Sequence, residues 1–219
     1  GICSDGEQNQ NETGIDCGGV CTRVCDADIE PLRLQWVRGF RVAPNWWSAM
    51  AYIENPNIGM RADNLQYRIE LYDNLGFVIA EHTGETYIHD EVVVPIYWGR
   101  IFPRGEREVM RATFTWLSEP EWHRTNEKRI VSTKEQQLTE RNGVPEVRAV
   151  LVNEEHVALR DITVNALVYN NQQNVIAISQ TVVPRLAARE ELPIVFAWQE
   201  PFPERGARIE LVPRVPPQE

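Results

Sequence analysis

The sequence predicts an all-β chain in which two tandem antiparallel β-sandwiches follow a small disulfide-stapled N-terminal module. Three observations predict this fold class. All four cysteines lie within the first 25 residues, a long internal repeat fills most of the remainder, and both copies of the repeat alternate apolar with polar residues at a period of two. We therefore place the module at residues 1–28, the first sandwich at 29–127 and the second at 128–219.

The negative charge is concentrated in the module. The 219 residues carry 32 acidic and 22 basic side chains, a formal net charge of −10, and residues 1–30 alone hold seven acids and one base. This balance excludes the class of nucleic-acid binders, which need clustered Lys and Arg. The longest apolar run, at 92–98, is far shorter than the roughly 20 residues that span a bilayer. No signal peptide is visible, so we expect any targeting segment or anchor to have been removed.

The cysteines predict two disulfides. Cys3, Cys17, Cys21 and Cys25 lie in a segment with too few apolar residues to bury a core, so covalent or metal staples must hold it. An even number of cysteines in this setting indicates disulfides and an oxidising compartment. Four cysteines allow three pairings that the sequence does not separate, and we favour Cys3–Cys21 with Cys17–Cys25. Zinc is the competing interpretation because four thiolates can hold it, although the spacing lacks paired C-x2-C knuckles.

The module also carries candidate calcium ligands. Oxygen-bearing side chains recur every three or four residues, at Asp5, Asn9, Glu12 and Asp16. Hard oxygen ligands on a loop with glycines are what calcium requires, although the spacing is not that of an EF-hand. The alternative is a solvated acidic loop that the disulfides hold. No other cofactor is expected.

The module resembles a known short motif. The string C-x-D-G-x-x-N-x-x-E-x-G-x-D-C-G-G-x-C-x-x-x-C, which covers residues 3–25, is similar to a cysteine-rich motif of secreted and surface-anchored bacterial proteins. In those proteins it often lies near a membrane anchor or between adhesive modules. The resemblance implies a location outside the cell and implies no reaction.

The rest of the chain contains a diverged repeat. Residues 62–80 match residues 159–177 at an offset of 97, and apolar side chains alternate with polar ones in both. The alternating apolar residues predict strands with one buried face: Leu65, Tyr67, Ile69 and Leu71, then Ile162, Val164, Ala166 and Val168. Turn-forming residues follow at 73–76 and 170–173. Short strands at this spacing, with no sustained helical period, favour antiparallel sandwiches.

A second resemblance comes from the repeat itself. The first copy contains Ile-x-Leu-Tyr-Asp at 69–73 and the second Ala-x-Val-Tyr-Asn at 166–170, with Asn55 and Asn153 upstream at matching positions. These residues are similar to the signature of FxLYD-type domains. The resemblance implies seven-stranded immunoglobulin-like sandwiches, which occur on bacterial and archaeal surfaces without a common activity. The departures from the signature are Ile and Ala in place of Phe, and Asn170 in place of Asp.

Further downstream, we align residues 114–120 with residues 196–201 at an offset of 82. This alignment leaves about 15 extra residues in the first copy, which we assign to an insertion at 84–99. Because the second copy lacks this apolar and aromatic segment, we expect it to be a protein contact or an edge for strand addition. Its candidate contact residues are Tyr87, Val92, Val94, Tyr97 and Trp98. The alternative is an edge hairpin that folds onto its own sandwich.

The join between the copies predicts a rigid connection. Residues 127–140 contain neither Gly nor Pro. We therefore expect one strand to run from the first sandwich into the second. Such a strand would give the chain the shape of a semi-rigid rod.

The tryptophans support a second functional interpretation. Trp116 and Trp198 follow Phe-x in both copies and are expected in the cores. Trp46 and Trp47 lie just before a predicted strand, and together with Trp98 they are candidates for stacking on sugars. The alternative function is therefore a carbohydrate-binding module or an accessory domain of a secreted enzyme.

The sequence favours a non-enzymatic role. The four histidines form no HExxH pair, and neither a G-x-S-x-G elbow nor a phosphate-binding glycine loop is present. We expect an extracellular or cell-surface protein with a structural or adhesive role. Its expected partners are proteins, with copies of itself in a filament or surface layer among the candidates, and not nucleic acids.

Overall fold

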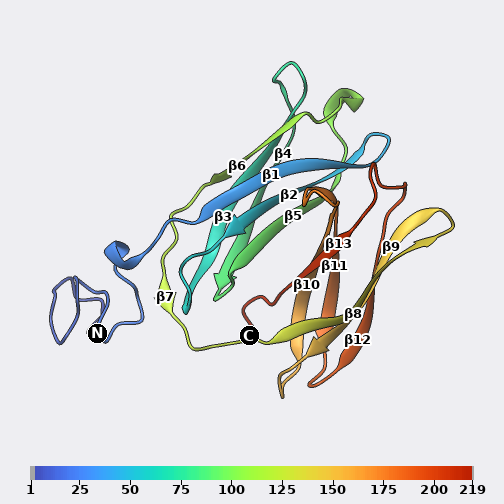
Figure 1. Cartoon of the computed structure of the whole chain (residues 1–219). Helices are drawn as coiled ribbons and strands as arrows, with labels where there is room; N and C mark the ends of the chain where they lie inside the picture. The colour runs from blue at the N-terminus through green and yellow to red at the C-terminus, as the bar shows by residue number, and fades with distance from the viewer. Residues whose placement is uncertain (1–2, 219) are drawn as a thin grey trace.

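The computed structural model describes residues 3–218 and confirms the all-β class (Figure 1). The described elements are thirteen strands and two short 3-10 turns. The first strands are β1 Arg33–Ala43, β2 Trp46–Glu54, β3 Met60–Tyr72, β4 Val78–His89, β5 Val93–Ile101, β6 Arg111–Trp116 and β7 His123–Arg124. The later strands are β8 Val131–Arg141, β9 Val144–Asn153, β10 Leu159–Tyr169, β11 Val175–Leu186, β12 Glu191–Ala197 and β13 Arg208–Arg214. The turns are η1 Asp26–Asp28 and η2 Arg104–Glu106.

The described strands form four antiparallel sheets, and the same strand order occurs twice. The first seven strands give the sheets β1-β2-β5 and β4-β3-β6, with β7 beside β3. The last six give β8-β9-β12 and β11-β10-β13. Strands β1 to β6 therefore correspond in order to β8 to β13. We call these two groups the first and the second sheet pair.

Three apolar clusters lie between four stacked sheets. One cluster fills the first sheet pair and contains Ile69 and Leu71, and a second fills the second sheet pair and contains Val164 and Val168. The period-two pattern thus marks the predicted buried residues in both copies. The third cluster joins β1, β2 and β5 to β10, β11 and β13, so the two sheet pairs pack face against face (Figure 1).

This packing corrects the prediction of a rod with a continuous connecting strand. Strand β7 ends at Arg124 and β8 begins at Val131, so no strand joins the sheet pairs. Their relative placement comes instead from the third cluster, in which Met50 and Leu167 are completely buried. The physical reason is that β2 and β10 are apolar on both faces, as is typical of strands that are covered on both sides.

A buried ion pair fastens the same joint. Arg214 at the end of β13 is 6% exposed. Its guanidinium donates to the Glu91 carboxylate at 2.6 and 3.1 Å and to the Thr86 hydroxyl at 3.1 Å, and it lies over the Tyr87 ring. Burial alone would lower the pKa of Arg214, but the Glu91 carboxylate raises it. A cation of the second sheet pair is therefore held by residues of the first.

Glu210 of β13 makes a second polar link across the joint. Its carboxylate accepts hydrogen bonds of 3.1 Å from the hydroxyl of Tyr52 on β2 and from that of Tyr169 on β10. Burial and the nearby Glu210 charge raise the pKa of Tyr52 above its usual value. Both hydroxyls consequently remain hydrogen-bond donors at neutral pH.

The predicted insertion at 84–99 is wrong. Residues 84–89 are the end of β4 and residues 93–99 belong to β5, and these strands correspond to β11 and β12 of the second sheet pair. Val94 is fully buried in the first core, Tyr97 packs in the joint and Trp98 packs against the first core. The error has a simple cause. The first Phe-x-Trp string lies on β6 and the second begins on β12 and ends just after it, and these two strands are not equivalent.

Candidate functional site

The N-terminal module has the favoured disulfide pairing. One disulfide joins Cys3 to Cys21 and the other joins Cys17 to Cys25. The module docks on the segment around β7, because the Val24 N–H donates to the carbonyl of Trp122 at 2.8 Å. Val24 is itself part of the first core. The module is therefore fixed to the first sheet pair and is not a free tail.

The candidate calcium ligands serve the module in another way. The Asp16 carboxylate accepts the N–H groups of Asp5 and Gly6 at 2.8 and 2.9 Å. The Asn9 amide donates to Asp5 and lowers the pKa of that carboxyl. Glu12 is buried, and its carboxylate accepts the Asn9 N–H at 3.2 Å. These contacts hold a loop that has no core of its own.

Within residues 3–218, only one group of His, Cys, Asp and Glu side chains has ligand atoms close enough for a metal, and it consists of Cys3, Glu12 and Cys21. The two sulfurs form a disulfide, so they are not thiolate ligands. The structure thus does not bring the candidate carboxylates together, and calcium stays a prediction. The zinc alternative needs four thiolates, whereas all four sulfurs are bonded in pairs.

The sugar-stacking candidates are mostly covered. Trp47 is 7% exposed in the first core, which contradicts its assignment as an exposed ring. Trp98 is half-buried and stacks on His82, with ring centroids 5.3 Å apart. Trp46 is half-buried and stacks on Phe102 at 6.4 Å. Of the predicted contact residues, Val92 is exposed, while Tyr87 lies beneath the Arg214 guanidinium.

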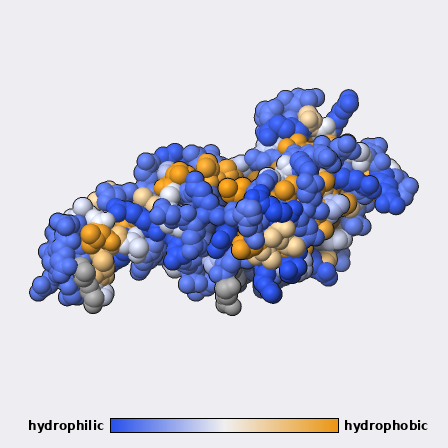
Figure 2. Space-filling model, turned by 90° about the horizontal axis from the view of Figure 1, so that it is seen from below, coloured by the Kyte–Doolittle hydropathy of each residue, from blue (hydrophilic) through white to orange (hydrophobic). Residues whose placement is uncertain are grey.

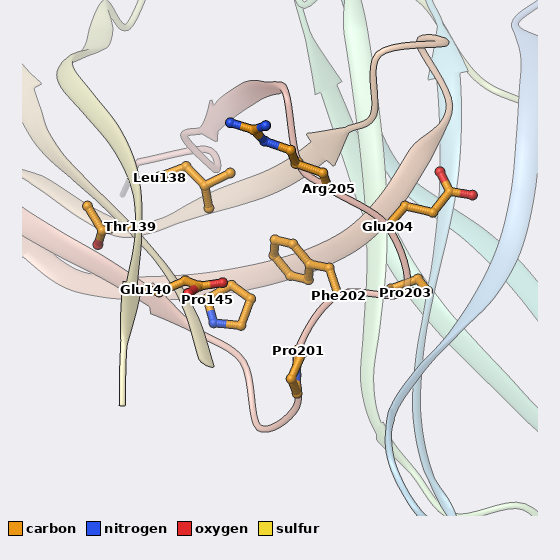
Figure 3. A pocket seen from close by; sticks show the side chains of 10 residues that line it. Leu138, Thr139, Glu140, Pro145, Pro201, Phe202, Pro203, Glu204 and Arg205 are labelled. Carbon is orange, nitrogen blue, oxygen red and sulfur yellow. The ribbon is translucent and has the colours of Figure 1, made fainter. Parts of the chain in front are cut away.

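One open groove lies beside β8, between that edge strand and residues 201–206 (Figure 3). Its volume is about 640 Å³. The ring of Phe202 faces Leu138 and Pro145 across it, and Glu140, Glu204 and Arg205 supply charges of both signs. An edge strand with an adjacent groove is a geometry that can accept an extended segment.

The two copies exchange a small and a large residue at the position where Leu138 and Gly206 line the groove. In the first copy, Val109 lies in van der Waals range of Gly39, which pairs with β2. In the second copy, Leu138 takes the position of Gly39 and Gly206 takes that of Val109. A Cβ on Gly206 would lie 2.7 Å from Leu138 Cδ2 and 2.9 Å from Val168 Cγ1. Only one large side chain therefore fits in each copy.

We predict that Gly206→Val destabilises the chain by about 2 kcal/mol because it overpacks this contact. The added substitution Leu138→Ala should recover most of that loss by removing the clashing methyls. Urea unfolding of the two variants checks this. Equal midpoints for the single and the double variant would contradict it.

Five exposed apolar residues lie at one end of the first sheet pair. The β3–β4 turn and the β5–β6 segment, which contains η2, lie at this end (Figure 1). Leu75, Phe77, Phe102 and Met110 are 59–67% exposed, and Val78 is 38% exposed. We call these five residues the apolar loop end.

Hydrogen bonds hold these loops in place. Although burial opposes the charge, the N–H groups of Leu75 and Phe77 (both 2.9 Å) and the Arg107 guanidinium keep the pKa of the Asp73 carboxyl below its usual value. The Met110 N–H donates to the Tyr72 carbonyl at 2.8 Å. The exposed apolar side chains thus stand on a fixed backbone.

The second copy is an internal control for this surface. Asn170 builds the same turn, with its side-chain oxygen accepting two N–H groups at 3.0 Å, and the Ala207 N–H bonds Tyr169 as Met110 bonds Tyr72. Leu75, Phe77 and Met110 therefore correspond to Gln172, Asn174 and Ala207. The second copy forms the same turn and the same backbone hydrogen bonds with polar or small residues at these positions. The fold therefore does not require apolar side chains at Leu75, Phe77 and Met110.

Comparisons with known proteins add no family. A scan against models of protein families finds no match, and a search of curated proteins finds no similar sequence. The resemblances to the cysteine-rich motif and to FxLYD-type domains accordingly remain predictions. Within the described residues, no helix is long and apolar enough to cross a membrane.

The apolar loop end is also locally basic. Residues 100–111 contain Arg100, Arg104, Arg107 and Arg111 against two glutamates, in a chain of net charge −10. The Arg111 guanidinium lies 4.1 Å from the centre of the Tyr72 ring. The site therefore combines exposed apolar area with arginines, which is typical of protein-contact surfaces.

Proposed function

We propose that this protein is a non-enzymatic extracellular or cell-surface protein with a structural or adhesive role, and that the apolar loop end is its protein-contact surface. The observation that carries the proposal is the contrast between the copies. Two identical turns differ in that one presents leucine and phenylalanine to solvent and the other presents glutamine and asparagine. Exposed apolar patches that a fold does not need indicate an interaction site.

The rest of the molecule supports this role. Two disulfides in a small module favour an oxidising compartment outside the cytosol. The third cluster and the Arg214–Glu91 pair fix the two sheet pairs to each other. A rigid body with pre-organised loops loses little conformational entropy when it binds a partner.

The test exchanges the apolar residues for those of the second copy, in the triple variant Leu75→Gln, Phe77→Asn, Met110→Ala. Because the second copy carries these residues on the same backbone, we expect the free energy of unfolding to change by less than about 1 kcal/mol. Binding to protein partners, measured by cross-linking on surface extracts of the source cells and then by titration, should weaken at least about tenfold.

The matched control is Val182→Thr, which removes exposed apolar area from β11 and should leave partner binding unchanged. Unchanged partner binding by the triple variant would contradict the proposal. Loop-dependent binding on a glycan array would favour the carbohydrate-binding alternative.

A further inference from the structure

We infer that the apolar loop end of one molecule binds the N-terminal module of a second copy, so that the chain assembles head to tail. This inference rests on the proposed function and names the partner of the same site. It follows from the charges of the two surfaces, from their apolar residues and from their positions in the fold.

The charges of the two surfaces are complementary. The module presents the exposed carboxylates Asp5, Glu7, Asp26 and Asp28. Beside the apolar loop end, residues 100–111 carry four exposed arginines against the exposed Glu106 and Glu108, which leaves this segment with a formal net charge of +2. Complementary charges steer encounter and fix orientation, and salt weakens them.

The module also offers apolar area to match the loops. Ile15 is 61% exposed and Val20 is 60% exposed. The module contains few apolar residues, and these two are left in contact with solvent. Figure 2 shows apolar surface at the end of the molecule where the module lies, within a mostly hydrophilic face. A contact with the loop end would therefore bury apolar side chains from both partners.

The two surfaces lie at opposite ends of the first sheet pair. Strand β2 starts near the loop end at Trp46, where that ring stacks on Phe102. Beyond the far end of β2, the Asn57 side chain bonds the backbone N–H and carbonyl of Glu30 at 2.9 and 2.8 Å and anchors the segment that follows the module. Figure 1 shows the module and the loops at these separate ends.

Two different surfaces at opposite ends make a heterologous contact, which leaves one free surface at each end of any oligomer. Such a contact extends into an open chain of molecules and does not close as a symmetric dimer would. An anionic membrane is the other surface that arginines and apolar loops could meet. The net charge of −10 on the whole chain disfavours that partner.

The experiment is sedimentation velocity of the full chain and of two variants over a range of concentrations. The loop variant is Leu75→Gln, Phe77→Asn, Met110→Ala. The module variant is Glu7→Gln, Val20→Ser, Asp26→Asn, Asp28→Asn, in which no changed side chain has a described hydrogen bond that holds the module. We expect the wild type to form growing oligomers and each variant alone to stay monomeric, with an apparent Kd raised at least about tenfold.

Mixing the variants is the decisive measurement. The loop variant keeps an intact module and the module variant keeps an intact loop end, so the mixture should form one-to-one dimers and nothing larger. High salt should weaken the association of the wild type, because the Debye length falls to about 3 Å at 1 M. The control Val182→Thr should assemble as the wild type does.

Four results would overturn the inference. If the module variant alone associates as the wild type does, the loop end binds something other than the module. If the wild type stays monomeric up to about 0.2 mM, the self-contact is absent, and the proposed function survives only if the loop variant loses a different protein partner. Loop-dependent flotation with phosphatidylserine vesicles would assign the surface to a membrane. Association of the loop variant equal to that of the wild type would show that the loop end makes no self-contact, and the proposed function would then stand only if this variant loses a different protein partner.

Discussion

Replacing Arg214 by methionine is expected to lower the free energy of unfolding by about 3 to 5 kcal/mol. The guanidinium is 6% exposed and makes two bonds to Glu91, so its removal leaves a carboxylate without its partner between the sheet pairs. The Thr86 hydroxyl loses its donor at the same time. Methionine keeps the length of the side chain, so the loss reports the charge and its hydrogen bonds more than the packing.

Urea unfolding at neutral pH measures this effect, and the double variant Arg214→Met, Glu91→Gln tests its cause. If the cost is an unpaired buried charge, the neutral amide should recover a large part of it. Arg205→Met is the matched control, because that arginine is exposed beside the groove and should change stability by less than about 0.5 kcal/mol. A double variant as unstable as the single one would contradict the explanation.

The sequence did not predict the joint between the two sheet pairs, in which Arg214 is buried. Alternation in β3 and β10 identified the buried face within each copy, because that pattern depends only on the period of a strand. The second buried face of β10 was not identified, although Leu167 and Tyr169 are apolar as well. Whether such residues face solvent or another sheet depends on contacts between segments far apart in the chain, which a local pattern does not record.

The candidate site was missed for a different reason. The alignment of the copies already placed Leu75 opposite Gln172 and Phe77 opposite Asn174, but an apolar residue in a turn is informative only when the turn is known to be identical and exposed. The predicted contact at 84–99 relied instead on an apparent insertion. That insertion came from matching two Phe-x-Trp strings on strands with different neighbours.

The disulfides were predicted more reliably, because the module cannot bury a core. Replacing Cys3 and Cys21 by alanine is expected to destabilise the module by about 3 kcal/mol, the value for a closed loop of 18 residues. The module should unfold locally while the sheet pairs stay folded, since Val24 packs into the first core and the other links are hydrogen bonds to residues 122–124. Hydrogen exchange should show fast exchange at residues 3–25 and unchanged protection in the strands.

The second disulfide is the matched control for this prediction. Replacing Cys17 and Cys25 opens a loop of eight residues and should cost about 2.5 kcal/mol, somewhat less than the first pair. If the module is the partner of the loop end, losing the first disulfide should also raise the apparent Kd of self-association, although neither binding surface has been changed directly. Unfolding of the whole chain would instead show that the module supports the first sheet pair. Unchanged protection of residues 3–25 would show that the hydrogen bonds of Asp5, Glu12 and Asp16 hold the loop without the covalent staple.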